Sequence, residues 1–265
     1  MSATGAMLGS KSSFSTRISL RWVPEVPEET TDTIVLSVGE YFVDLRMDKA
    51  SGAIDWAMAG TRIEENPNEI PLKVLFTREL DSFNEIGIVD VGNFSPLPNG
   101  DELECGEMPR TDLPGSPMTG FEEVWRELAF REGPEGAKKG LSWILESDNR
   151  DLDFGERNEV TVTKMFMGRI WGTYLAFCQV QTHTREKSVS GEWTVKRTGA
   201  EVSARREEWS SGSWEEKYLV GPDGGAVPSM KSGFAGEGEG SWRVPGETVT
   251  IDGNAFIVRA FEEIQ

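Results

Sequence analysis

The sequence predicts an all-β protein made of two consecutive small units, each an antiparallel barrel or sandwich. Apolar and polar residues alternate with a period of two in roughly a dozen short segments, which is typical of half-buried strands. Gly and Pro residues separate these segments at turn-like intervals. The Gly-rich residues 132–140 divide the chain, which predicts an N-terminal domain at 14–132 and a C-terminal domain at 140–265. Residues 1–13 are small and polar, and we expect them to be disordered.

The expected strands follow one another along the whole chain. In the first unit they lie at residues 17–22, 34–38, 41–46, 54–59 and 72–76. In the second unit they lie at residues 141–145, 160–165, 174–185, 192–197, 214–220, 248–251 and 255–261. The last two flank Asp252, Gly253 and Asn254, and a Gly-containing link of this length predicts a hairpin.

One segment, at about residues 120–131, breaks the strand pattern and predicts a short helix. Phe121, Val124, Trp125 and Leu128 have the i, i+3, i+4, i+7 spacing of an apolar helical face. Thr119 and Glu122 have the spacing of a capping box at its start.

Two long segments are expected to be irregular loops. Residues 95–118 carry five prolines, and residues 221–246 carry many glycines with few apolar side chains. The first loop precedes the predicted helix, and we expect the second to be mobile.

The charge balance excludes two large classes of partner. Asp and Glu number 45 against 27 Lys and Arg, so the net charge is -18. Nucleic acids and anionic membrane surfaces both require clustered positive charge, which this chain lacks, so a neutral or cationic partner is favoured. The acidic residues, Glu207 and Glu208 among them, are expected on outward faces and in loops as a solubilising coat.

The chain also lacks the marks of secretion and membrane insertion. No apolar signal segment opens it, and its most apolar stretch, Ile170 to Val180, is too short to span a bilayer. Cys105 and Cys178 are isolated thiols, which favours a reducing compartment over a disulfide scaffold. These features predict a soluble, cytoplasmic protein without membrane insertion.

No established catalytic or cofactor motif is present in the sequence. Nucleotide-binding glycine loops, a zinc-protease motif and a nucleophile elbow are all missing. A single histidine excludes metal sites that need two imidazoles. We therefore expect neither a metal nor a cofactor.

The only histidine, His183, is the candidate catalytic residue. On the strand 174–185 one face carries Leu175, Phe177, Gln179, Gln181 and His183, grading from apolar to amide to imidazole. Such a face suits a strand that lines a barrel pocket, with hydrogen-bonding groups at the mouth. There the imidazole would act as a general acid or base, or orient a ligand. The alternative is a solvated histidine near the end of a hairpin.

Nine tryptophans are the more informative part of the composition. A barrel lined by such rings binds flat apolar or aromatic molecules well. We expect Trp56, Met58 and Trp171 to line the pocket together with Phe177, Gln179 and Gln181. The alternative for most tryptophans is ordinary core packing.

Several short motifs resemble a known family. The string from Asp55 to Thr61 (DWAMAGT), the segment from Phe121 to Leu128, the GRIWG strand at 168–172 and the DGN turn at 252–254 resemble the fungal Hri family. That family is named for a member that associates with a casein-kinase-type kinase. The resemblance runs from about residue 16 to the end of the chain. It implies two consecutive calycin-like, lipocalin-type barrels and no established reaction.

The sequence therefore predicts cofactor-independent binding of a small apolar or aromatic molecule in a lipocalin-like pocket. Fungal biosynthetic cyclases share a double-lipocalin architecture, so a cyclisation, isomerisation or Diels–Alder-type step in fungal secondary metabolism is one expectation. The alternative is a non-enzymatic interaction or regulatory protein that binds a kinase or another protein. Whether the protein is an enzyme stays open at this point.

Overall fold

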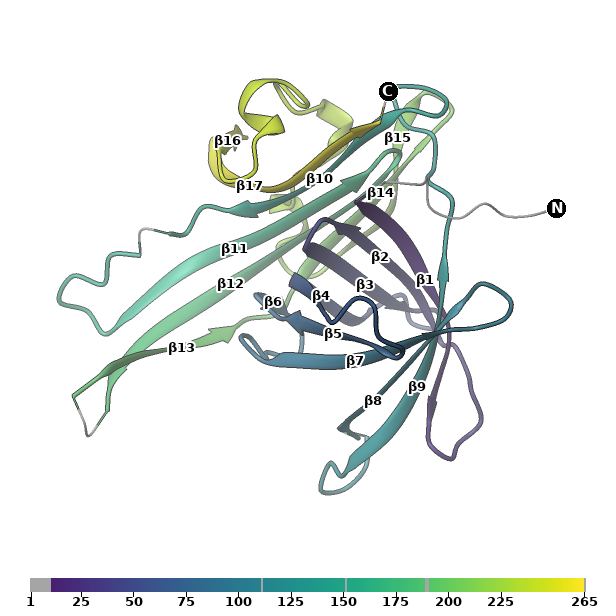
Figure 1. The fold of residues 1–265 in the computed structure, drawn as a ribbon. Helices are drawn as coiled ribbons and strands as arrows, with labels where there is room; N and C mark the ends of the chain where they lie inside the picture. Colours follow the sequence, from purple (N-terminus) through teal and green to yellow (C-terminus); the bar gives the residue numbers. More distant parts are fainter. Residues whose placement is uncertain (1–10, 111, 151, 189–190, 265) are drawn as a thin grey trace.

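The structure is a computed structural model that describes residues 11–110, 112–150, 152–188 and 191–264, and it confirms the all-β class (Figure 1). Strands and three short 3-10 helices make up the regular elements of these residues. Most of the predicted disordered N-terminus, residues 1–13, lies outside the described residues, and the first strand starts at Ser12.

The N-terminal half forms a closed antiparallel barrel. Its strands are β1 (Ser12–Trp22), β2 (Thr31–Val38), β3 (Tyr41–Asp48), β4 (Ile54–Glu65), β5 (Leu72–Thr77), β6 (Leu80–Asp81), β7 (Val89–Pro96), β8 (Glu102–Pro109) and β9 (Met118–Glu127). They pair in the order β3-β2-β1-β9-β8-β7-β5-β4, and β4 pairs back with β3 to close the ring. The short β6 is attached to β4 outside this ring. The antiparallel barrel predicted for this half is therefore confirmed.

The C-terminal half forms a second antiparallel sheet. Its strands are β10 (Gly140–Ser147), β11 (Glu159–Ile170), β12 (Thr173–Lys187), β13 (Trp193–Gly199), β14 (Ser203–Ser210), β15 (Ser213–Val220), β16 (Thr248–Ile251) and β17 (Asn254–Ile264). They pair in the order β15-β14-β12-β11-β10-β17-β16, with β13 paired to β12. Among the described residues β15 and β16 do not pair with each other, so the second predicted barrel is an open sheet. The hairpin predicted at Asp252 and Gly253 is present between β16 and β17.

The predicted helix at 120–131 is wrong, because most of that segment is strand β9. Phe121, Glu123 and Trp125 face the inside of the barrel, and the strand pairs with β1 on one side and β8 on the other. Pairing with a strand on each side outweighs the helical spacing of the four apolar residues, which is also compatible with a strand. No helix in the described part of the chain is long and apolar enough to cross a membrane.

The two sheets share one hydrophobic layer, which we call the contact layer. In the part of the barrel formed by β2, β3 and β4, the apolar side chains of alternate residues point outward, away from the barrel interior. They pack against one face of β10, β11, β12 and β14. The barrel contributes Leu36, Val43, Leu45, Ala57 and Ala59, and the second sheet contributes Ile144, Phe166, Ile170, Leu175 and Phe177. Figure 1 shows this sheet lying across one side of the barrel.

The other face of the second sheet is covered by residues 221–246. Three 3-10 helices, η1 (Gly224–Ala226), η2 (Met230–Ser232) and η3 (Gly240–Arg243), shape this segment. Trp143 on β10 packs against Trp242 with ring centroids 5.5 Å apart, and its Nε1 donates to Glu237 at 2.7 Å. The segment predicted as a loop contains no strand, and its Val227, Met230, Phe234 and Trp242 complete a second core.

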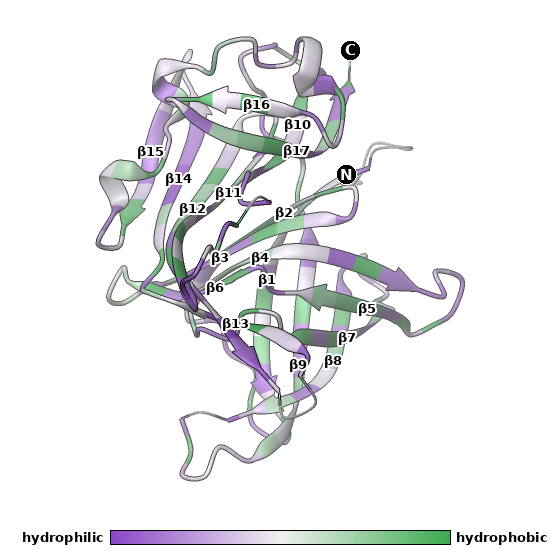
Figure 2. Ribbon diagram, turned by 90° about the vertical axis from the view of Figure 1, so that its left-hand side faces the viewer, coloured by the Kyte–Doolittle hydropathy of each residue, from purple (hydrophilic) through white to green (hydrophobic). Residues whose placement is uncertain are grey.

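The other predicted loop and the acidic coat also need correction. Residues 95–118 include all of β8, the end of β7 and the first residue of β9, so the longest link among the described residues of this segment is the one between β8 and β9. Glu207 is fully buried, where it accepts hydrogen bonds from Arg205 and Ser229. Along the strands hydrophilic and hydrophobic residues are interspersed (Figure 2), and several of the hydrophilic ones point inward.

Gly168 on β11 offers a direct test of the contact layer. A Cβ at this position would lie 2.7 Å from Cγ2 of Val43 and 2.8 Å from Cδ1 of Ile144. We expect Gly168→Ala to lower the free energy of unfolding by about 1–3 kcal/mol through overpacking, measured by urea denaturation. The matched control is Gly225→Ala, because a Cβ there meets no atom within 4 Å. Adding Val43→Ala to the Gly168 variant should recover part of the lost unfolding free energy, because it removes the clashing methyl groups. If the changes in unfolding free energy of the two single variants simply add in the double variant, the two residues do not share a contact.

Candidate functional site

The closed barrel encloses a cavity of about 710 Å³, which we call the barrel cavity. Side chains from β1, β2, β3, β4, β5, β7, β8 and β9 line it. Its volume lies within the range of about 300–1,000 Å³ that is usual for small-molecule sites.

Aromatic and thioether side chains form the apolar wall of the barrel cavity. Phe42, Trp56 and Met58 form a buried cluster inside the barrel, and Phe76 packs against it. Phe42 and Phe76 meet edge to face with ring centroids 5.5 Å apart. Aromatic rings that present their faces and edges to a cavity favour a flat aromatic ligand.

A buried group of charged side chains forms a polar part of the cavity wall next to these aromatic residues. The Arg46 guanidinium is 2.9 Å from an Asp44 carboxylate oxygen and 3.2 Å from a Glu123 oxygen. Glu123 also accepts a hydrogen bond of 2.6 Å from Arg17. All four side chains are at most 6% exposed, so these pairs compensate one another away from solvent.

Two indole rings lie beside the Arg46 guanidinium. Its central carbon is 4.6 Å from the Trp56 ring centroid and 5.5 Å from that of Trp125, which are cation–π distances. Trp56 Nε1 donates to Asp81 at 2.7 Å, and Trp125 Nε1 donates to Glu104 at 2.8 Å. Each indole ring is therefore fixed in orientation by the Arg46 guanidinium beside it and by the hydrogen bond of its Nε1.

Glu104 is the most perturbed acid of the barrel cavity. It lies directly opposite Glu123 in the pairing of β8 with β9. Burial, together with the negative charge of Glu123, raises the pKa of Glu104 to about 8. Burial also raises the pKa of Asp44. At neutral pH the Glu104 carboxyl group therefore holds its proton and can donate a hydrogen bond.

The lining of the barrel cavity carries more acidic than basic side chains. The acids are Glu40, Asp44, Glu64, Asp90, Glu102, Glu104, Glu107, Glu123 and Glu127. The bases are Lys11, Arg46, Arg62 and Arg78. This excess of negative charge disfavours an anionic ligand and favours a neutral or cationic one.

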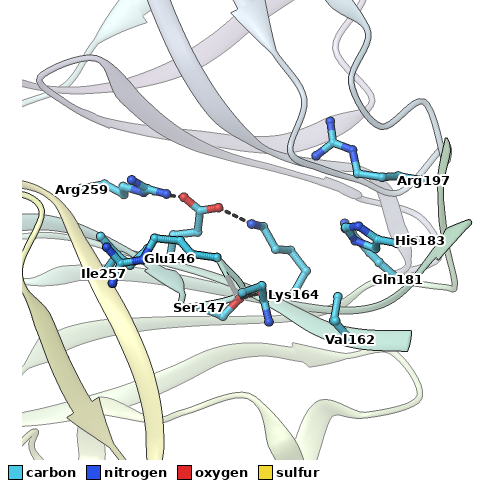
Figure 3. Close-up of a pocket in the computed structure, with 11 residues that line it drawn as sticks. Glu146, Ser147, Val162, Lys164, Gln181, His183, Arg197, Ile257 and Arg259 are labelled. Atoms are coloured by element: carbon cyan, nitrogen blue, oxygen red, sulfur yellow. Dashed lines mark hydrogen bonds and ion pairs between the residues drawn. The ribbon is translucent and has the colours of Figure 1, made fainter. Parts of the chain in front are cut away.

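A second, smaller cavity of about 200 Å³ lies on the second sheet, and we call it the His183 pocket (Figure 3). Gln181 and His183 of β12 line it together with Lys164 of β11 and Arg197 of β13. Burial and the positive charges of Arg197 and Lys164 lower the pKa of His183. The imidazole is thus neutral at physiological pH.

The structure divides the predicted site residues between four places. Trp56 and Met58 line the barrel cavity, whereas Gln181 and His183 line the His183 pocket. Trp171 and Phe177 are buried in the contact layer. Gln179 donates hydrogen bonds of 2.9 Å to the carbonyl groups of Asp81 and Ala200, which ties β12 to β6 of the barrel. The graded face of β12 therefore points toward the outer wall of the barrel, and the ligand-binding and catalytic roles of these residues stay predictions.

The sequence analysis missed the buried charges of the barrel cavity. The signal that could have found them is Asp44 followed two residues later by Arg46, on one face of a strand whose other face is wholly apolar. Glu104 and Glu123 could not be paired from sequence, because the register of β8 and β9 was not known. In the described part of the chain no three His, Cys, Asp or Glu residues are grouped as a metal site would require.

Comparisons with known proteins agree with this architecture. Residues 13–244 match the family model described as Protein HRI1. The fold is similar to that in "Crystal structure of uncharacterized protein YLR301w" from Saccharomyces cerevisiae, with a TM-score of 0.61 and 15% sequence identity. That superposition covers 95% of this chain and 99% of the yeast chain, and at this identity it shows the fold alone. No curated protein sequence matches the chain.

The raised pKa of Glu104 predicts a pH-dependent stability. Between its ordinary value of 4.5 and about 8, the folded protein holds a proton that the unfolded chain has released. Stability should therefore fall as pH rises through this range, by at most about 1.4 kcal/mol per pH unit. Glu104→Gln cannot ionise, so its unfolding free energy should fall less steeply between pH 5 and pH 8 in urea denaturation. The exposed Glu107→Gln on the same strand should keep the original slope. An unchanged slope in the Glu104 variant would show that this acid is ionised throughout.

Proposed function

Because the chain belongs to the Protein HRI1 family and folds around a closed β-barrel, we propose that it binds a flat aromatic molecule in the barrel cavity. The ligand would be neutral or positively charged. The observation that carries the proposal is the arrangement of Trp56 and Trp125 beside the buried Arg46 guanidinium, in a cavity whose apolar wall is formed mainly by Phe and Met side chains.

The orientation of the ligand would depend on the polar part of the cavity wall. A protonated Glu104 donates a hydrogen bond to a carbonyl or ether oxygen of the ligand, while the aromatic body packs on Phe42 and Phe76. The Arg46 guanidinium is paired with Asp44 and Glu123. It therefore positions the indole rings and is not free to bind an anionic group of the ligand.

Catalysis of a cyclisation or isomerisation is a further step of the same proposal. His183 lines a different cavity from Trp56, so it does not supply the proton for a ligand in the barrel. Glu104 is the group that favours such chemistry, because a neutral carboxylic acid in an apolar cavity can act as a general acid. The shape of the cavity and the orientation that it imposes on the ligand would supply the remainder of the rate enhancement.

The alternative function, recognition of a kinase or another protein, is supported by a different surface. In the described residues β13 pairs only with β12, so its other edge is not covered by a strand. Trp193 and Val195 on β13 are 56% and 52% exposed. An exposed apolar edge strand can pair with a strand from a partner.

Titration with flavone, followed by intrinsic tryptophan fluorescence, tests the binding proposal. Flavone is planar and neutral and carries a carbonyl oxygen for Glu104. We expect saturable quenching of the wild type. Ser15→Trp should block it by placing bulk in the barrel cavity, and Trp125→Leu should weaken it about tenfold or more.

Trp193→Leu is the matched control, because it removes an exposed indole outside the barrel. It should leave the dissociation constant unchanged, and circular dichroism should confirm that every variant is folded. Wild-type protein that shows no saturable response, or a Ser15→Trp variant that binds as tightly as the wild type, would contradict binding inside the barrel.

A further inference from the structure

The His183 pocket contains two buried polar atoms that have no partner. His183 Nε2 and Gln181 Oε1 are both inaccessible to solvent and make no hydrogen bond, and the two residues are 9% and 1% exposed. Leaving such atoms unpaired costs stability, so a polar group that fits between them would bind with a gain.

The orientation of the Gln181 amide is fixed by its neighbours. Its Nε2 donates hydrogen bonds of 3.0 Å to the Glu79 carbonyl oxygen and to Gln179 Oε1. Exchanging the amide atoms would place an oxygen against these two acceptors. Oε1 is therefore the atom that remains available, and it requires a donor.

The charges around the His183 pocket are unevenly compensated. Lys164 and Arg259 both bind the single carboxylate of Glu146, the arginine at 2.5 Å (Figure 3). Arg197 pairs with Glu79 from the barrel side. Because two cations share one carboxylate, the pocket holds an excess of positive charge within a protein of net charge -18.

The close approach of the barrel keeps these groups in place. Gly199 lies beside Gln181 in the pairing of β12 with β13. A Cβ at Gly199 would collide with the side-chain amide of Gln179, whose Nε2 is bonded to the Asp81 carbonyl group of β6. The absence of a Cβ at Gly199 thus leaves room for the Gln179 amide to reach the barrel. Gln181 and His183 come next on the same face of β12.

We propose that the His183 pocket binds the oxyanion of a small molecule that also carries a hydroxyl group or another hydrogen-bond donor. A neutral imidazole with its proton on Nε2 donates to the oxyanion, beside the positive charges of Lys164 and Arg197. The donor of the ligand satisfies Gln181 Oε1. A hydroxycarboxylate and a singly protonated phosphate both have this chemistry. The site is separate from the barrel cavity, whose acidic lining disfavours such a ligand.

The single histidine of the chain makes the test direct, since the imidazole resonances in an NMR spectrum come from one residue. The full-length protein at pH 7 is titrated with inorganic phosphate, with glycolate and with sodium chloride at matched ionic strength. We expect a saturable shift of the His183 resonances with phosphate or glycolate but not with chloride. A response to phosphate alone identifies a phosphate site, and a response to glycolate alone identifies a carboxylate site.

Two substitutions decide whether the shift reports the proposed contacts. Lys164→Met should weaken binding about tenfold, as expected for loss of a charge-assisted contact, and Arg197→Gln on the edge strand should weaken it similarly. Lys217→Met on β15 is the matched control, because its ammonium group is paired with Glu215 outside the pocket. The proposal is overturned by absence of a saturable shift with both oxyanions, by an equal shift with chloride, or by equal affinities of the Lys164, Arg197 and Lys217 variants.

Discussion

The packing of the second sheet against the outside of the barrel is the constraint on which the other features depend. Strands β2, β3 and β4 must present an apolar face to the contact layer, so Val43, Leu45 and Ala57 point out of the barrel. Period-two alternation then sends their neighbours inward, and these neighbours include Asp44, Arg46 and the large side chain of Trp56. The barrel therefore has its most uniform apolar surface outside and a mixed aromatic and charged lining inside.

Charges that face inward in this way need compensation within the barrel. Arg46 is held between Asp44 and Glu123, and its flat guanidinium also lies against indole rings. Burial, reinforced by the negative charge of Glu123, raises the pKa of Glu104 to about 8, so Glu104 keeps its proton in a lining whose acids already exceed its bases. The same balance that stabilises the cavity thus creates a neutral acid group in an aromatic site.

The sequence predicted strands and turns most reliably where alternation of apolar and polar residues marks one buried face. The alternation around Ile54 to Met58, the β-branched run at 160–165 and the Asp252–Gly253 turn all predict elements that are present. It failed at β9, where apolar residues at helical spacing also fit a strand. It also failed at Glu207, whose carboxylate accepts hydrogen bonds from Arg205 on β14 and from Ser229 and Met230 at the start of η2. Arg205 is only two residues from Glu207, but Ser229 and Met230 lie more than twenty residues away, and a single sequence does not reveal such distant partners of a buried charge.

The graded face of β12 illustrates how a correct local pattern can acquire a different meaning in three dimensions. Leu175 and Phe177 are apolar because they enter the contact layer, and Gln179 is polar because it meets the backbone of β6 at the edge of that layer. Beyond this edge the same face continues into a pocket where the Nε2 atom of His183 has no hydrogen-bond partner. An interior lining would present the same gradient from apolar to imidazole. The distinction depends on the opposite face: Tyr174 and Cys178 belong to a second hydrophobic core, so β12 is covered on both sides and cannot line the inside of a barrel of its own.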